Sequence, residues 1–422
     1  MKKSLILALA AAGMLSACTS NDDLGNENVG ELTKQKIELG VSSATVQTRG
    51  TGTVGDLEDG ENVWAGQELF VYMLDKGEMS LGLYKDPDAV GNATPVFDNE
   101  KFFAPTGADQ AEATTQSGKI AYYPVSGNYD FWGYRVDDAG VGTPYMVNET
   151  GDQTDVEADA VARVIDVKID GSQDIMTGKA VPTEADVQKL GQKSENFFSA
   201  YAARKDVQPN IKFEHNLARL TFHVRAGSKA TCGQIANGDV TDPVYVTDVK
   251  VLSKNEGKLT VAYKGAKPAS VLNFSEATDS LHLMQRSVAG VDDHNLPLEK
   301  LQPVALTWNN ETDAPDTIKV GEALLVAPGE VSYPLTIDLT QVVKQNVNGD
   351  SKKLALQQNT KIEMDPNGVK TFEAGKSYDV TITVYGLERI VVTATLVGWQ
   401  DGGSIDIDDD RVPDSEYTEP NA

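Results

Sequence analysis

The residue with the clearest chemical role is Cys18, which closes the run Leu15-Ser16-Ala17-Cys18. Two lysines precede an apolar stretch, 5–14, that is too short to span a bilayer as a helix. Together with the small residues before the cysteine, these features predict a lipoprotein signal peptide over residues 1–17. Cys18 would then become the first residue of the mature chain and carry acyl chains that anchor it durably to a membrane. An ordinary secretory signal with an incidental cysteine is the alternative.

A second candidate is Arg49, which precedes Gly50 and a short stretch of glycine and threonine. An arginine followed by small, flexible residues is typical of a site that a trypsin-like protease cuts. A plain loop arginine fits the same residues, so both interpretations stay open at this point. The glycines at 50, 52 and 55 also match G-x-G-x-x-G, but the acidic, turn-like segment 56–62 follows where a dinucleotide site needs a helix. We therefore predict no nucleotide cofactor.

Metal and catalytic chemistry have little support in the sequence. His215 and His223 are eight residues apart, which is roughly 26 Å along one extended strand and too far to share a metal. Cys232 has no obvious base beside it. The alternating acidic run at 406–410 resembles the start of a calcium loop, but Arg411 stands where that loop needs glycine. We predict no metal, no cofactor and no catalytic residue, and hence not an enzyme.

The overall charge excludes one class of partner. The chain of 422 residues has 63 acidic and 37 basic side chains, for a net charge of −26. Such a chain repels nucleic acid, which we exclude as a partner. Only two cysteines are present and one is the lipid site, so no internal disulfide is predicted. No segment after the signal peptide approaches the roughly eighteen uninterrupted apolar residues of a membrane span, and the mature chain is predicted to be soluble and tethered by lipid.

The elements that would position these residues are mostly strands. Ile37, Leu39 and Val41 alternate with polar or small residues, which predicts a half-buried strand over 36–49. Many short apolar runs between turn residues follow, a pattern typical of β-sandwiches. The clearest of these runs are 69–74, 120–123, 129–134, 161–169, 211–226 and 389–399.

Several of these segments carry finer predictions. We expect 211–226 to be one strand and 389–399 to be buried on both faces inside a sheet. The aromatic run 129–134 fits core packing better than a sugar-stacking platform. A helix is predicted over 183–204, beginning at a capping pair and interrupted by a glycine, and one or two helical turns over 338–346.

Composition and pattern divide the chain into successive parts. After the signal peptide, 18–35 is predicted to be a flexible polar leash. An N-terminal β-sandwich domain over 36–206, with 36–49 as its first strand, and a C-terminal one over 207–400 follow. Residues 401–422 form an acidic tail.

The order and spacing of several motifs resemble the fimbrillin family, the lipoprotein pilins of Bacteroidales-type surface fimbriae. These motifs are the lipidation signal at Cys18, the strand that ends in Thr48-Arg49-Gly50, Asp174-Ile175-Met176-Thr177-Gly178, the run from Phe213 to Leu220, and Phe372-Glu373-Ala374-Gly375-Lys376-Ser377-Tyr378 with the strand ending at Trp399. The resemblance covers essentially the whole chain.

The resemblance implies an all-β fold of two tandem transthyretin-like Greek-key β-sandwich domains with one or two short helices. It also implies export to the outer membrane as a surface lipoprotein, anchored in membrane lipid through acylated Cys18, and cleavage between Arg49 and Gly50 by an arginine-specific protease. The segment from Ile37 to Thr48 would then be removed, and identical or related fimbrial subunits would polymerise by donor-strand exchange to serve adhesion. The adhesion target stays open, with a host glycan or a host protein as candidates.

The chain departs from the family pattern in its tail, where the family places the donor strand. The tail offers Ile405, Ile407, Val412 and Tyr417 among many acids, and the acids would have to face solvent. The donor segment and the place of the subunit in stalk, base or tip therefore stay open. The alternative function is a non-polymerising surface lipoprotein, either a fimbrial anchor or tip or a module that binds a glycan or host protein.

Overall fold

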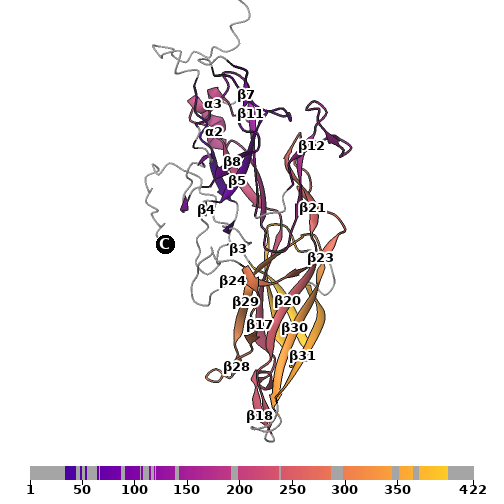
Figure 1. Cartoon of the computed structure of the whole chain (residues 1–422). Coiled ribbons are helices and arrows are strands. Elements are labelled where there is room, and N and C mark those ends of the chain that lie inside the picture. The colour runs from indigo at the N-terminus through magenta and orange to yellow at the C-terminus, as the bar shows by residue number, and fades with distance from the viewer. Residues whose placement is uncertain are drawn as a thin grey trace, which may run out of the picture.

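The computed structural model describes residues 34–43, 48–49, 53–54, 64–65, 67–86, 91–104, 106–107, 114–115, 118, 120–137, 142–191, 198–236, 239–286, 298–344, 351–364 and 370–397. These residues form a mostly β, elongated molecule with an upper and a lower part in Figure 1. Its helices are short: α2 (Glu184–Lys189), α3 (Ala200–Arg204) and the 3₁₀ turn η1 (Lys229–Cys232). No helix in this part of the chain is long and apolar enough to cross a membrane.

The upper part contains two sheets, which we call sheet I and sheet II. Sheet I has the strand order β1 (Gly40–Ser43), β16 (Asn210–His215), β15 (Ile175–Ala180), β11 (Tyr129–Val136), β5 (Glu68–Asp75), β8 (Glu100–Phe103) and β10 (Thr114–Thr115). Sheet II has the order β13 (Gln153–Thr154), β12 (Tyr145–Val147), β14 (Ala162–Lys168), β21 (Glu256–Tyr263) and β22 (Leu272–Phe274).

The lower part contains sheets III and IV. Sheet III has the order β29 (Thr317–Val326), β17 (Ala218–Ala226), β32 (Ser377–Val384) and β33 (Ile390–Val397). Sheet IV has the order β18 (Gln234–Ala236), β19 (Asp239–Thr241), β30 (Ser332–Lys344), β20 (Tyr245–Lys254) and β23 (Thr278–His282), with β26 (Val304–Ala305) beside β20 and β31 (Ser351–Glu363) beside β30.

Five two-stranded ribbons complete the described elements. They pair β2 (Thr48–Arg49) with β3 (Thr53–Val54), β4 (Trp64–Ala65) with β9 (Thr106–Gly107), β6 (Leu83–Tyr84) with β7 (Thr94–Pro95), β24 (Met284–Arg286) with β25 (Leu298–Lys300), and β27 (Trp308–Asn309) with β28 (Ala314–Pro315). Each ribbon is too short to be stable without the larger body to which it is attached.

Two apolar clusters hold these layers together. The smaller cluster lies on one face of sheet I, where Met73, Phe131, Met176 and Phe213 come from four neighbouring strands. The larger cluster takes residues from the other face of sheet I and from sheets II, III and IV. Because one core joins the upper and lower parts, the molecule is stabilised along most of its length by a continuous apolar interior.

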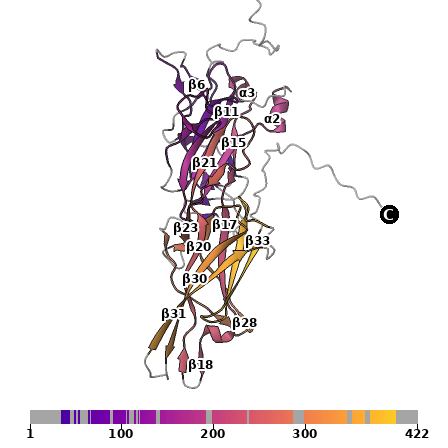
Figure 2. The same cartoon turned by 90° about the vertical axis from the view of Figure 1, so that its right-hand side faces the viewer.

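The chain passes from the lower to the upper part between β20 and β21. Asn255 is the single residue between them, it is buried, and its carbonyl accepts a hydrogen bond from the Ile169 amide at 2.8 Å. Figure 2 shows β20 below and β21 above this point. Sheets I and II therefore contain strands from both sides of residue 206, and the domain boundary placed there stays a prediction.

Most of the predicted strands are present, but the sheet to which a strand belongs, or its place in that sheet, differs from the prediction in some cases. Segment 211–226 is not one strand: β16 and β17 belong to different sheets, with the chain turning at Asn216 and Leu217. Strand β33 is an edge strand rather than a buried one, because β32 is the only described strand that pairs with it, and Leu396 is 55% exposed. The predicted helical turns at 338–346 are wrong within the described residues, since 338–344 belongs to β30.

The predicted capping pair is confirmed. The Thr183 hydroxyl accepts from the Asp186 amide at 3.2 Å, and the Asp186 carboxylate accepts from the Thr183 amide at 3.0 Å. The helix it starts ends by Leu190, and α3 follows separately after its own cap at Ser199. The single helix expected over 183–204 is therefore two short helices, with 192–197 outside the described residues.

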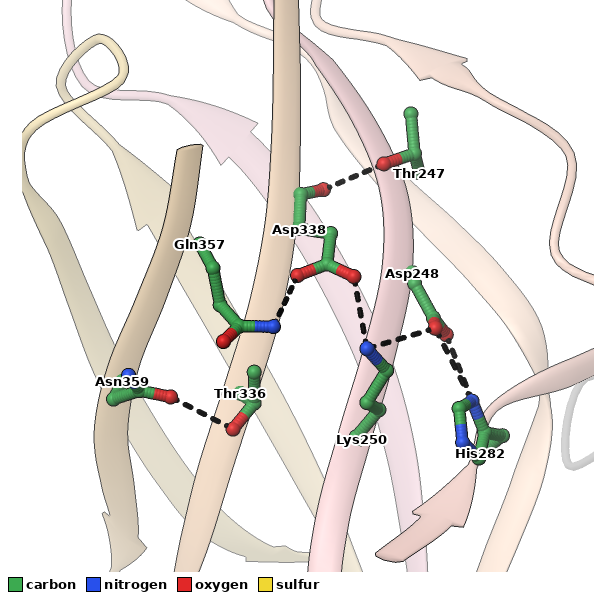
Figure 3. Close-up of polar contacts among 8 residues, drawn as sticks. All are labelled: Thr247, Asp248, Lys250, His282, Thr336, Asp338, Gln357 and Asn359. Atoms are coloured by element: carbon green, nitrogen blue, oxygen red, sulfur yellow. Dashed lines mark hydrogen bonds and ion pairs between the residues drawn. The ribbon is translucent and has the colours of Figure 1, made fainter. Parts of the chain in front are cut away.

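The outer face of sheet IV carries a polar ladder, drawn in Figure 3. Lys250 lies 2.9 Å from the Asp338 carboxylate and 3.3 Å from Asp248, and Gln357 of β31 donates to Asp338 at 2.8 Å. Further along the same face, His282 contacts Asp248 at 3.1 Å. The polar groups of this ladder are therefore paired with side chains of the same sheet.

Candidate functional site

The segment that includes β1 is bound on both flanks by main-chain hydrogen bonds. On one flank, the Ile37 amide donates to the Ala121 carbonyl at 2.9 Å, and the Tyr123 amide donates to the Gln35 carbonyl at 2.8 Å. On the other, the Gly40 amide donates to the Pro209 carbonyl at 2.9 Å. Beyond this point β1 runs parallel to β16. Segment 120–123 was predicted to be a strand, but among the described residues it forms only one isolated bridge, between Lys36 and Tyr122.

Polar side chains of the β16 region add to this contact. Gln208 accepts from the Glu38 amide at 3.3 Å and donates to the Lys36 carbonyl at 3.1 Å, so one side chain holds two main-chain groups. The Ser42 hydroxyl donates to the Asn210 side chain at 3.1 Å. Nothing in the local sequence around 208–210 indicates this role, because the contacting residues are about 170 positions away.

The apolar side chains of the segment enter the smaller core. Ile37, Leu39 and Val41 are 4%, 1% and 1% exposed and lie in the same cluster as Ile211 and Phe213 of β16. Burying an aliphatic side chain of this size contributes about 1.5–3 kcal/mol. The predicted alternation of apolar and polar residues in the first strand is confirmed over 37–42, and its apolar face is part of the fold.

Strand β1 is also the edge of sheet I. Within the described part of the chain its four residues pair only with β16, from Gly40 with Asn210 to Ser43 with Phe213. A strand of this length forms few ladder hydrogen bonds, so most of its hold on the body comes from its side chains. Removing it would leave β16 with an unpaired edge beside an apolar slot.

The predicted processing residue Arg49 lies downstream of this buried strand. It belongs to β2, whose ribbon with β3 pairs Arg49 with Thr53 and Thr48 with Val54. A cut after Arg49 would therefore separate β1 from everything that follows β2. Gly50 lies outside the described residues, and so do 44–47.

Other predicted site residues also fall outside the described part of the chain. Cys18 is one of them, as are the leash up to residue 33 and the tail at 401–422 with Ile405, Ile407, Val412 and Tyr417. Lipidation and the identity of the donor segment stay predictions.

The titratable residues singled out for metal or nucleophilic chemistry are held in structural roles. His215 is buried in β16 with its Nδ1 2.8 Å from the Asp174 carboxylate, whereas His223 belongs to β17 in another sheet. Burial raises the pKa of the Cys232 thiol, and the Asp316 charge adds to the shift, which opposes thiolate formation. Among the described residues, no group of three or more His, Cys, Asp or Glu side chains could hold a metal ion.

The aromatic run 129–134 is core, as predicted. Tyr129, Phe131, Trp132 and Tyr134 are all at most 4% exposed. Phe131 packs edge-on against Phe198 at 5.7 Å between ring centroids. These rings are therefore not available to stack on a sugar.

Comparison with known proteins agrees with the resemblance drawn from the motifs. Among solved structures, a candidate cell adhesion protein from Bacteroides eggerthii is 12% identical over 86% of this chain and 96% of its own, with a TM-score of 0.35. A candidate adhesin from Bacteroides thetaiotaomicron is 8% identical over 85% and 96%, with a TM-score of 0.35. A fimbrial protein from Bacteroides ovatus is 10% identical over 84% and 51%, with a TM-score of 0.26. These TM-scores are too low to support an argument about fold.

The comparison of sequences gives the family directly. No curated protein matches the chain. The family described as Fimbrillin-like matches residues 58–399, which is most of the chain. This family consists of structural rather than enzymatic proteins, which agrees with the prediction that the chain is not an enzyme. The chain belongs to the fimbrillin-like family.

Proposed function

We propose that the protein is a structural subunit of a cell-surface fimbrium, exported as a lipoprotein through Cys18, cleaved after Arg49 and polymerised by donor-strand exchange. The observation that carries this proposal is the position of segment 37–43, which ends in the edge strand β1 upstream of Arg49 and yet buries Ile37, Leu39 and Val41. Association with other fimbrial subunits and a role in adhesion agree with the family and with the names of the similar structures.

The physical basis is that a buried edge strand can be replaced by another strand with the same alternation. Its loss exposes main-chain groups of β16 and the apolar slot that Leu39 and Val41 fill, and both favour pairing with an incoming strand. A contact in which each subunit fills the slot of the next does not close on itself. It therefore grows a filament.

The acidic tail is the segment that we propose as donor. Ile405 and Ile407 alternate with acids, as Leu39 and Val41 alternate with polar or small residues in segment 38–42. Seated on β16 in the same way, the isoleucines would enter the core and the acids would point to solvent, where their charge costs little. The two tandem transthyretin-like sandwiches implied by the family resemblance are part of this proposal.

Limited proteolysis tests the proposal. The full mature chain without lipid, and the variant Arg49→Gln as its control, would be treated with low-dose trypsin. N-terminal sequencing and light scattering would follow. We expect the wild-type chain to begin at Gly50 and to form multimers, and Arg49→Gln to keep its first strand and stay monomeric. A chain cleaved at Arg49 that stays monomeric at high concentration would contradict polymerisation and favour the non-polymerising surface lipoprotein.

A further inference from the structure

A cleft in the upper part lies between sheet I and β21. It consists of two cavities of about 590 and 340 Å³ that share Lys179, Val181 and Tyr263 as lining residues. Strand β15 belongs to the floor of the cleft and β21 borders it, and the two strands lie side by side in Figure 2. Volumes of this size are typical of sites for small ligands.

The floor of the cleft has an unusual arrangement of charge. Trp132, Lys179 and Lys212 occupy one row across β11, β15 and β16, because Lys179 is the register partner of both other residues. Two lysines directly opposite each other on neighbouring strands repel, which destabilises a sheet. The Asp130 carboxylate lies 3.0 Å from Lys179 and offsets its charge.

Lys212, the other lysine of this row, has no such acidic partner among the described residues. Within the described part of the chain it makes no ion pair, although the protein carries a net charge of −26 and many of its other described lysines contact an acid. The nearby Glu214 is already paired with Lys267, which lines the same cavity. An uncompensated cation in a concave site of an acidic protein indicates an anionic ligand.

The remaining lining groups indicate what carries the anion. Tyr263 packs edge-on against Trp132, with ring centroids 4.4 Å apart, and is itself half-buried. The Trp132 ring is 3% exposed with the Lys179 ammonium 4.5 Å from its centroid, so Tyr263 offers the accessible ring. Thr177 and Asn210 add polar side chains to the lining, which can hydrogen-bond hydroxyl groups.

The strands around the cleft argue against a peptide bound as an added strand. Strand β15 lies between β11 and β16, β16 between β15 and β1, and β21 between β14 and β22. On the cleft floor, Lys179 and Lys212 are paired with a neighbouring strand on both sides, whereas β22 pairs only with Gly257–Leu259 of β21. The floor therefore offers no free edge for main-chain pairing, and a ligand there is recognised by side chains.

We propose that this cleft binds a carboxylated saccharide, with Lys212 holding the carboxylate and the Tyr263 ring lying against the sugar. The proposal names a ligand class for the adhesion included in the proposed function. It concerns a site on the other face of sheet I from the buried side chains of β1. Binding is therefore expected of the uncleaved monomer.

Calorimetry on the uncleaved mature chain tests this inference, with methyl glucuronide as the probe and methyl glucoside as its uncharged counterpart. We expect the glucuronide to bind and the glucoside to bind far more weakly. Lys212→Gln should weaken glucuronide binding roughly tenfold or more, since it removes a charge-assisted hydrogen bond. The matched control is Lys168→Gln, an exposed lysine of β14 outside the cleft, which should leave binding unchanged.

Further arms distinguish other ligands. Tyr263→Ala should weaken binding of the glucuronide. A site that recognises charge alone would bind the glucuronide equally well with and without this substitution. A synthetic peptide of residues 401–422 that bound more tightly than the glucuronide and depended on Lys212 would overturn the saccharide class. Equal binding of glucuronide by the wild-type chain and Lys212→Gln would overturn the site. None of these readouts depends on cleavage or polymerisation, so failure here and failure of the fimbrial proposal are distinguishable.

Discussion

The two edge strands β1 and β31 close their sheets by different means. Strand β1 has four residues paired with β16, and its segment places three apolar side chains in the core. Strand β31 has 13 residues paired with β30 along the whole length, yet most of its side chains are exposed. It carries Lys352, Lys353 and Lys361, and lysines on an edge discourage pairing with other chains.

The difference supports the proposal that β1, rather than β31, is the edge strand that is exchanged. Strand β31 is held to β30 by many main-chain hydrogen bonds, and it is the next strand after β30 in the chain. Nothing therefore favours its release. Strand β1 is covalently joined to the rest of the fold through the segment that leads to Arg49. Its non-covalent binding depends on side chains that another strand with the same alternation could supply. We therefore propose that the β31 edge is permanent and that the β1 edge can be replaced.

The largest effect is expected from removing residues 34–49 altogether. Three buried aliphatic side chains at about 1.5–3 kcal/mol each amount to much of the stability of an ordinary domain. The truncated chain should unfold at lower denaturant or form multimers, as measured by chemical denaturation and light scattering. A synthetic peptide of residues 34–43 added in excess should restore the monomer. Normal stability of the truncated monomer without peptide would show that β1 is not part of the core.

A single substitution in each edge sharpens the comparison. Leu39→Ala should lower the free energy of unfolding by about 2–5 kcal/mol, because Leu39 is 1% exposed. The matched change Leu356→Ala on β31 should cost no more than about 0.5 kcal/mol, since that side chain is 41% exposed. Equal losses in urea denaturation would contradict the distinction between the two edges.

A smaller effect is expected where amide side chains support each edge. Gln208→Ala removes two hydrogen bonds to the main chain of the β1 segment, at Glu38 and Lys36, and should cost about 1–2 kcal/mol. Gln357→Ala removes one contact of β31 to Asp338 on an exposed face and should cost less. Hydrogen exchange would show whether Gln208→Ala loosens residues 35–43 first, and uniform loosening of the whole upper part would argue against a local role.

The smallest effect concerns the polar ladder beneath β31. Partial burial acts to raise the pKa of Asp338, but the hydrogen bonds from Lys250 and Gln357 outweigh it and hold the pKa below its ordinary value of 3.8. The hydrogen bond to Asp338 in turn raises the pKa of Lys250 above 10.5. The stabilising contribution is therefore present between these two ordinary values. It is lost as pH falls through the folded pKa of Asp338 or rises through that of Lys250.

Comparing the wild-type chain with Lys250→Gln across pH measures this contribution. Since both groups are partly exposed, the difference in unfolding free energy should be about 0.5 kcal/mol near neutral pH and shrink at both extremes. A difference that grew toward low pH would have the wrong sign for a salt bridge of Asp338.

Local pattern was enough to predict the strands and the helix cap. The alternation at Ile37, Leu39 and Val41 depends only on period two, and the Thr183–Asp186 pair depends on contacts three residues apart. Which strand lies at an edge depends on partners far along the chain, and this is why 389–399 was predicted to be buried on both faces although β33 lies at an edge. Similarly, 211–226 reads as one strand because the turn at Asn216 and Leu217 lacks glycine or proline.

The candidate site divides in the same way. Its first strand could be predicted from sequence, whereas the position of 121–123 and 208–210 beside that strand could not. The cleft residue Tyr263 was also missed, because the sequence around it gives no sign of a binding site. Its role is suggested only by its position next to Trp132 and Lys179 in the fold. Residues brought together by long-range pairing carry no local signal of that proximity.

Hydrogen exchange of the β16 main-chain amides tests the central claim most directly. It would be measured in the intact monomer, in the chain cleaved at Arg49 under dilute conditions, and in its multimers. We predict protection of the amides that face β1 in the intact chain, loss of that protection in the cleaved monomer without its first strand, and recovery in the multimer. Amides that stay equally protected after the strand has left would contradict the account, because no slot would then have opened.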